Sequence, residues 1–302
     1  MDLAQELAQY GPTASYPPPS LGEAQAYCQR LAKTHYENFS VASRLFPRHL
    51  DQHLCNVYSY CRWADDLADE SAKDEALALL DWWQRQLDAV YSGEATHPVF
   101  VALRETIGQF QLPHEPLADL LIAFRRDQAQ TRYATLADLL TYCEKSANPV
   151  GRIVLHLGRS ADEENFQLSD SICTGLQLAN FWQDVKRDHQ RGRIYIPQEN
   201  CRAADWDEAR FNAGISDEAF QALLKPLVDD AASRLAAGDK LAQQVDRGLR
   251  LPICVFTAGG RAILAAIRQS GYDVWSRRPT VGRIAKLRIL ASAALQSIWW
   301  PG

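Results

Sequence analysis

The chain has 302 residues, of which 47% are hydrophobic, and a formal net charge of -5. A chain of this size can bury a substantial core. Its acidic balance, without a separate run of Lys or Arg, argues against nucleic acid as a partner. The seven cysteines include no Cys-x-x-Cys pair and predict reduced, buried thiols in a cytoplasmic protein. The N-terminus lacks a signal-peptide pattern, and no apolar stretch reaches the roughly 18 residues of a membrane span.

Helix patterns recur along the chain, and strand patterns do not. Residues 1–20 are expected to form a flexible N-terminal arm, because the proline-rich segment 11–20 cannot propagate a helix. Residues 21–302 are expected to form one all-α domain, with the segment 190–214 irregular. Amphipathic stretches between short breakers predict helices near 21–34, 48–70, 74–91, 97–110, 115–128, 135–157, 168–189, 216–245, 251–270 and 281–298.

Two acidic motifs lie far apart in the chain and share one spacing. Asp65 and Asp69 are four positions apart, as are Asp184 and Asp188, with Asn180 one further turn before them. On a helix these side chains lie on one face, where like charges repel unless a cation lies between them. Mg2+ binds one or two carboxylates together with substrate phosphates. The two motifs therefore predict a helical enzyme that acts on a diphosphate with Mg2+.

Basic residues beside both motifs strengthen this interpretation over the alternative of a solvated helix face. Arg62 lies one turn before Asp65, where a guanidinium could bind phosphate oxygens, and the loop 186–193 is rich in Lys and Arg. A di-iron carboxylate bundle needs two Glu-x-x-His units, and the chain offers only the segment 94–97. A Gly-x-Gly-x-x-Gly nicotinamide motif is absent. Trp63, Trp82 and Trp83 are expected in the core.

Five blocks of sequence carry a resemblance to a known family. They lie at 35–40, 58–69, 142–151, 177–188 and 193–197. In this order and spacing, the chain resembles the squalene/phytoene synthases, the head-to-head prenyltransferases, over roughly residues 25–280. The resemblance implies a single-domain isoprenoid-synthase helical bundle, with the two acidic helices facing each other across a central cavity. It also implies several bound Mg2+ ions and a prenyl diphosphate substrate.

The resemblance implies roles for individual residues. Metal ligands would be Asp65, Asp69, Asn180, Asp184 and Asp188. The substrate diphosphate would be bound by His35, Asn38, Arg62 and Arg193. Tyr142 and Tyr195 match tyrosines near the diphosphate and the reacting carbons. A non-catalytic relative would be expected to lose motif aspartates, and all of them are present here.

Within the family, the segments 36–43, 146–151 and 271–279 look most like the hydroxysqualene synthases, the hopanoid-pathway branch of bacteria. This resemblance implies ionisation of presqualene diphosphate and capture of the rearranged cation by water, without NADPH. Asn148 and Pro149 predict a polar kink that could hold such a water; alternatively, Asn148 satisfies the carbonyl that Pro149 frees. The remaining alternatives are NADPH-dependent squalene synthase, presqualene diphosphate synthase acting on farnesyl diphosphate, and phytoene synthase.

The C-terminal segment 283–300 is amphipathic, basic and tipped with tryptophan. Such a helix could lie on a membrane surface, which would suit an enzyme releasing a C30 lipid. The alternative is that it packs on the helical core. The sequence gives no indication of the oligomeric state.

Overall fold

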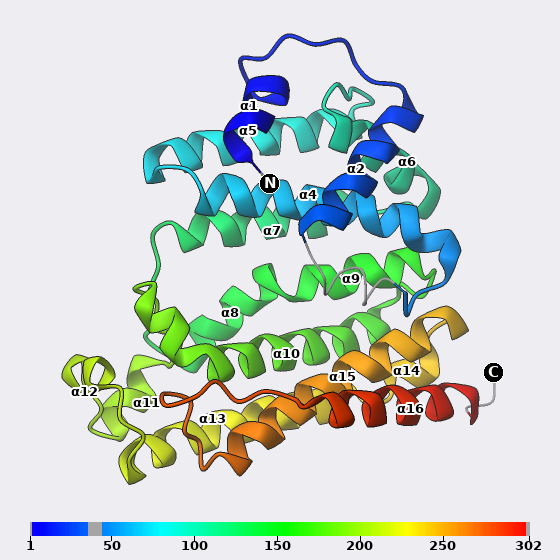
Figure 1. Ribbon diagram of the computed structural model, residues 1–302. Coiled ribbons are helices and arrows are strands. Elements are labelled where there is room, and N and C mark those ends of the chain that lie inside the picture. Colours follow the sequence, from blue (N-terminus) through cyan, green and yellow to red (C-terminus); the bar gives the residue numbers. More distant parts are fainter. Residues whose placement is uncertain (1, 36–43, 300–302) are drawn as a thin grey trace. The chain divides into compact units, whose positions relative to one another are not determined.

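The computed structural model describes residues 2–35 and 44–299, without the side chains of residues 34, 35, 298 and 299. The described residues form helices joined by loops, with one isolated parallel bridge between Arg132 and Ile194 (Figure 1). The all-α prediction is therefore confirmed. Packing divides the chain into two compact units, one of Met1–Ala129 with Ile153–Arg159 and one of Gln130–Arg152 with Ser160–Gly302.

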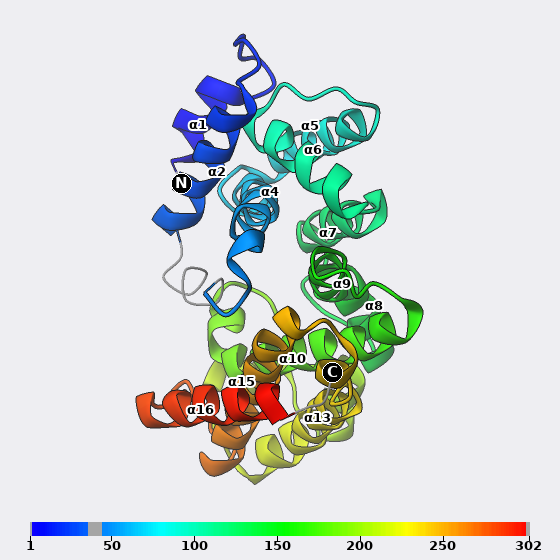
Figure 2. The same cartoon turned by 90° about the vertical axis from the view of Figure 1, so that its right-hand side faces the viewer.

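The first unit is built around one central helix. Its elements are α1 (Leu3–Tyr10), α2 (Leu21–His35), η1 (Arg48–Leu50), α4 (Asp51–Asp69), α5 (Lys73–Tyr91), α6 (Pro98–Phe110) and α7 (His114–Asp127). In Figure 2, α4 is seen nearly end-on, with α2 on one side and α5, α6 and α7 on the other. Because α4 is enclosed in this way, one of its faces is buried along its whole length.

The second unit contains the longest helix of the described chain. Its elements are α8 (Leu136–Ser146), the first half of α9 (Asn148–Leu157), α10 (Glu163–Gln190), α11 (Gln198–Ala203), α12 (Glu208–Ala213), α13 (Glu218–Ala237), α14 (Leu241–Gln244), α15 (Arg247–Gln269) and α16 (Arg283–Trp299). α10 packs against α13 and α15. Gly175 permits the approach to α13, since a Cβ there would lie 2.9 Å from the Leu235 side chain and 3.1 Å from the Ala231 carbonyl oxygen.

The core of the first unit is an aromatic cluster around a buried histidine. Trp63 of α4 stacks on Trp83 of α5, with ring centroids 5.2 Å apart, and the His97 ring meets both edge-on at 4.7 and 4.9 Å. Trp63, Trp82 and Trp83 are all buried, which confirms the sequence prediction. His97 also caps α6, because its Nδ1 accepts a hydrogen bond from the Val99 amide at 3.2 Å.

Several helix boundaries differ from the sequence prediction for local reasons. The stretch 135–157 is broken at Ala147, just before Asn148 and Pro149, as the predicted kink requires. The stretch 216–245 is broken at Gly238. The segment 190–214, predicted to be irregular, contains the short helices α11 and α12. Within residues 1–20, for which the sequence predicted a flexible arm, the structure has the helix α1.

α15 is apolar enough to raise the question of a membrane span. Over 18 residues its mean hydropathy is 1.4, and 39% of that window is buried inside the fold. Among the described residues it is the one helix long and apolar enough to cross a bilayer, judged by length and composition alone. Core helices of water-soluble proteins also meet this criterion, so the observation is weak evidence.

Candidate functional site

The first acidic motif lies at the C-terminal end of α4, and buried polar contacts fix the helix. The Asn56 side chain is fully buried and donates hydrogen bonds to the Ala102 carbonyl and the Thr106 hydroxyl of α6, each at 3.0 Å. His53 lies 3.0 Å from the same hydroxyl. A buried side-chain amide needs hydrogen-bond partners, so these contacts favour one rotation of α4 about its axis. That rotation leaves Asp65 partly exposed and Asp69 exposed.

Arg62 holds the carboxylates of this motif together. Its Nη2 forms an ion pair with Asp66, and its Nη1 lies 3.3 Å from Asp65 Oδ2. Asp66 is buried, and burial raises the pKa of its carboxyl to about 6 although the Arg62 charge lowers it. Asp66 was not among the predicted site residues. It lies three positions after Trp63, on the apolar face of α4, and that spacing could have identified it as inward-facing.

The second acidic motif lies near the C-terminal end of α10 in the other unit. Asn180 is exposed, whereas Asp184 and Asp188 are partly buried. Burial and the neighbouring Asp184 charge raise the pKa of the Asp188 carboxyl to about 7, against the opposing charges of Arg191, Arg193 and Arg187. This carboxylate pair would gain from a cation between its members.

A segment that follows α15 supplies a cation to this motif. Arg278 Nε donates to Asp184 Oδ1 at 2.6 Å, and its Nη2 donates to Asp184 Oδ2 at 2.7 Å. The same Nη2 lies 2.7 Å from the Gln183 side-chain oxygen. Arg278 was not among the predicted site residues, although it lies in the block 271–279. Nothing in that block indicates which carboxylate its guanidinium meets.

The two predicted catalytic tyrosines lie in one aromatic cluster of the second unit. Tyr195 stacks on Phe181 of α10, with ring centroids 3.8 Å apart, and lies 6.2 Å from Tyr142. Tyr133 was not among the predicted site residues. Its ring centroid lies 5.5 Å from that of Tyr142 and 5.8 Å from that of Tyr195. Phe181 is three positions before Asp184, so the cluster flanks the carboxylate face of α10.

Asn148 is buried at the break between α8 and α9. Its side-chain oxygen accepts a hydrogen bond from the Thr174 hydroxyl of α10 at 2.9 Å. Beside it, Gly151 allows α9 to meet α10, because a Cβ there would lie 2.3 Å from Ser169 Oγ and 2.6 Å from Cys173 Sγ. The predicted polar kink therefore joins α9 to α10.

Of the remaining predicted phosphate-binding residues, the structure describes the side chain of Arg193 alone. The loop after α10 turns at Gly192, and the Arg193 amide donates to the Asp188 carbonyl at 2.8 Å. The Arg193 charge also acts on the Asp188 carboxyl. Asn38 lies outside the described residues, and the side chain of His35 is likewise not described. The assignment of Arg193, Asn38 and His35 to phosphate binding stays a prediction.

The donor sets are consistent with Mg2+ bound jointly by protein and phosphate. In the part of the chain that the structure describes, no group of three or more His, Cys, Asp and Glu residues is placed to hold a metal ion. Each motif instead offers two aspartates of the predicted ligand set, Asp65 with Asp69 and Asp184 with Asp188. One or two carboxylates completed by substrate phosphates are a common way for proteins to bind Mg2+. The donor chemistry of each motif therefore fits that ion.

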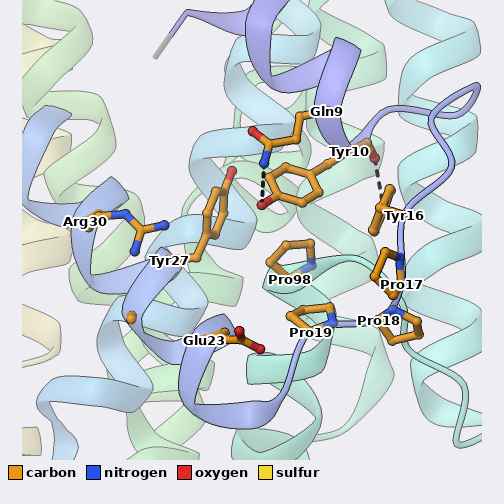
Figure 3. A pocket seen from close by; sticks show the side chains of 11 residues that line it. Gln9, Tyr10, Tyr16, Pro17, Pro18, Pro19, Glu23, Tyr27, Arg30 and Pro98 are labelled. Carbon is orange, nitrogen blue, oxygen red and sulfur yellow. Dashed lines mark hydrogen bonds between the residues drawn. The ribbon is translucent and has the colours of Figure 1, made fainter.

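The first unit also has a pocket of about 460 Å³, partly open to solvent, where the N-terminal segment meets α2 (Figure 3). Tyr10, Tyr16 and Tyr27 line it together with Pro17–Pro19. The Tyr16 hydroxyl donates to the Tyr10 carbonyl at 3.3 Å, which ties the proline segment to α1. None of the predicted site residues whose side chains the structure describes lines this pocket.

Known proteins resemble the chain over most of its length. Residues 15–285 match the family model for squalene/phytoene synthase. The crystal structure of squalene synthase HpnC from Alicyclobacillus acidocaldarius is 42% identical and superposes with a TM-score of 0.81, covering 84% of this chain and 96% of that one. A hydroxysqualene synthase from Rhodopseudomonas palustris is 36% identical over 76% of this chain and 79% of its own. A 15-cis-phytoene synthase from Synechococcus elongatus is 29% identical over 92% and 94%.

Proposed function

Because the chain belongs to the squalene/phytoene synthase family, we propose that it converts presqualene diphosphate into hydroxysqualene and diphosphate with Mg2+. The carbon–oxygen bond to the diphosphate breaks, the resulting cation rearranges, and a water oxygen forms the new bond and then loses its proton. NADPH takes no part. The proposal is carried by α10, which bears the carboxylates Asp184 and Asp188 beside Phe181 of the aromatic cluster.

The acidic motifs would bind the reacting end of the substrate. Asp65 and Asp69 on α4, and Asn180, Asp184 and Asp188 on α10, would hold Mg2+ through oxygen atoms, as ions of this kind prefer. When bound, Mg2+ supplies Lewis-acid stabilisation of the departing diphosphate. Arg62 and Arg193 would contact phosphate oxygens, as guanidinium groups do.

The aromatic cluster would stabilise the cation that remains. Tyr142 is almost fully buried, and its ring lies 6.2 Å from Tyr195 and 6.3 Å from Phe181. Aromatic faces attract a cation by about 0.5–2 kcal/mol each, more where water is excluded. A cation beside these rings would therefore be stabilised without meeting bulk water too early.

Capture of the carbocation by water requires a polar group that binds a water molecule within otherwise apolar surroundings. Asn148 and Thr174 form such a pair, since both are buried and joined at 2.9 Å. A water molecule bound there could attack the cation. The 36% identity to a protein named hydroxysqualene synthase supports water, rather than hydride, as the final nucleophile.

The deciding experiment incubates the purified protein and Mg2+ with presqualene diphosphate in oxygen-18 water, without NADPH. Hydroxysqualene carrying the isotope, identified by mass spectrometry, is the expected product. Parallel reactions contain farnesyl diphosphate with and without NADPH, and geranylgeranyl diphosphate. Squalene formed only with NADPH, presqualene diphosphate as an end product, or phytoene would each refute the proposal and identify the corresponding activity.

We further propose that the enzyme meets an anionic lipid surface through α16. One side of this helix packs on α15 with Ala293 buried, as the core-packing alternative expects. Another side leaves Ile284, Leu287 and Leu295 60–69% exposed. Within α16 the chain has three basic residues, Arg283, Lys286 and Arg288, and no acidic one. Apolar side chains next to uncompensated positive charge favour an anionic bilayer as the partner.

A further inference from the structure

The ion pair between Arg278 and Asp184 occupies both oxygens of a proposed metal ligand. The Arg278 guanidinium donates to Oδ1 at 2.6 Å and to Oδ2 at 2.7 Å, in the parallel two-bond geometry typical of strong Arg–carboxylate pairs. The Asp184 side chain is only 13% exposed, so solvent screens the pair less than it would on the surface. A metal ion could not use these oxygens in the same directions while the guanidinium remains.

The segment that carries Arg278, residues 273–279, is anchored on both sides of it and is called the C-terminal strap. Lys186 Nζ of α10 donates to the Trp275 carbonyl at 2.8 Å, and the Gln183 amide donates to the Pro279 carbonyl at 2.6 Å. At the start of the strap, Asp273 Oδ1 accepts hydrogen bonds from the backbone amides of residues 275 and 276, at 3.1 and 2.9 Å. These contacts hold the strap in a position where the Arg278 guanidinium meets the Asp184 carboxylate.

Packing fixes the strap in the same place. The Trp275 ring is 4% exposed and lies about 6 Å from three rings, those of His189, Phe211 and Phe220. Because α10 and this ring hold the backbone on both sides of Arg278, release of Asp184 would involve a change of the Arg278 side-chain rotamers.

We propose that Arg278 is a positioning residue that holds Asp184 when no metal is bound and must release it before Asp184 can coordinate Mg2+. This inference rests on the proposed function, which makes Asp184 a metal ligand. The released guanidinium needs a new anionic partner, and a diphosphate offers one with the same two-bond geometry. Metal and diphosphate would then each favour binding of the other, since the diphosphate removes the competitor for Asp184.

The test measures metal binding by the full chain rather than catalysis. Mn2+ is titrated into the protein without diphosphate, and the free ion is followed by electron paramagnetic resonance. Arg278→Gln is expected to tighten Mn2+ binding about two- to fivefold, the scale of a partly exposed ion pair. Arg277→Gln is the matched control: it removes the same charge from the neighbouring exposed residue. Arg278→Lys keeps the charge but not the two-bond geometry and should lie between the wild type and Arg278→Gln.

Equal Mn2+ affinities in Arg278→Gln and Arg277→Gln, with Arg278→Lys like the wild type, would overturn the inference. So would weaker binding in both Arg278 variants with unchanged thermal midpoints. Should Arg278→Gln fail to fold, the comparison of Arg278→Lys with the wild type decides the question. Asp184→Asn separates the two proposals. If this substitution leaves Mn2+ binding unchanged, the metal assignment itself is wrong; if it weakens binding while the Arg278 variants change nothing, the strap inference alone fails.

Discussion

Lowering the pH should destabilise the first unit through His97. The ring is fully buried, and burial lowers its pKa from 6.5 to about 3. Its Nδ1 accepts a hydrogen bond from the Val99 amide, which an imidazolium cannot do because both its nitrogens then carry hydrogen. The folded protein therefore requires the neutral ring, whereas the unfolded chain takes up a proton near pH 6.5.

The size of the effect follows from these two pKa values. The unfolded state binds more protons than the folded state between pH 6.5 and about pH 3, so stability falls as the pH falls through that window. Each pH unit in the window costs about 1.4 kcal/mol, so His97 alone should remove about 2 kcal/mol of unfolding free energy between pH 7 and pH 5. One opposing effect is present: the faces of nearby rings such as Trp63 attract a cation by up to about 2 kcal/mol.

Guanidinium unfolding of the wild type and of His97→Asn at pH 7, 6 and 5, followed by circular dichroism, tests this reasoning. Asparagine is a good helix N-cap and does not titrate, so the variant keeps an acceptor for Val99 but loses the proton uptake. Lost ring packing shifts the stability of the variant by the same amount at every pH. The wild type should therefore lose about 2 kcal/mol more than the variant between pH 7 and pH 5. Parallel pH profiles would refute the reasoning and show that the surrounding rings offset the burial of the charge.

Three further predictions concern the proposed activity. Asp184→Asn should lower the turnover of presqualene diphosphate by about 10²–10³-fold, because it removes a charge that would stabilise the metal-bound transition state; an unchanged rate would exclude Asp184 as a ligand. Asn148→Ala should lower the share of hydroxysqualene among the products, measured by mass spectrometry, because it removes the polar group placed to bind water; an unchanged share would leave Asn148 a purely structural role. The double substitution Ile284→Glu with Leu287→Glu should abolish co-sedimentation with phosphatidylglycerol vesicles, whereas Ile215→Glu, at a residue 59% exposed elsewhere, should not. Equal binding by both variants would locate the lipid contact elsewhere.

The sequence by itself determined the features that depend on local spacing. The all-α class follows from apolar residues at helical intervals, and the break before Pro149 follows from the missing amide hydrogen. The acidic motifs are local in the same sense, since four residues on a helix make about one turn. Trp63, Trp82 and Trp83 were also predicted as core residues from the sequence, and all three are buried.

Tertiary structure decided which groups meet from distant parts of the chain. Tyr133 joins Tyr142 and Tyr195 because the bridge between Arg132 and Ile194 aligns their two segments. Arg278 reaches Asp184 across 94 positions because Lys186, Gln183 and the buried Trp275 fix the strap on α10. Helix periodicity orders neighbours within about two turns, whereas contacts over longer separations depend on how buried side chains pack. The sequence therefore determined the acidic motifs and the local counterion Arg62, whereas the fold determined the distant counterion Arg278.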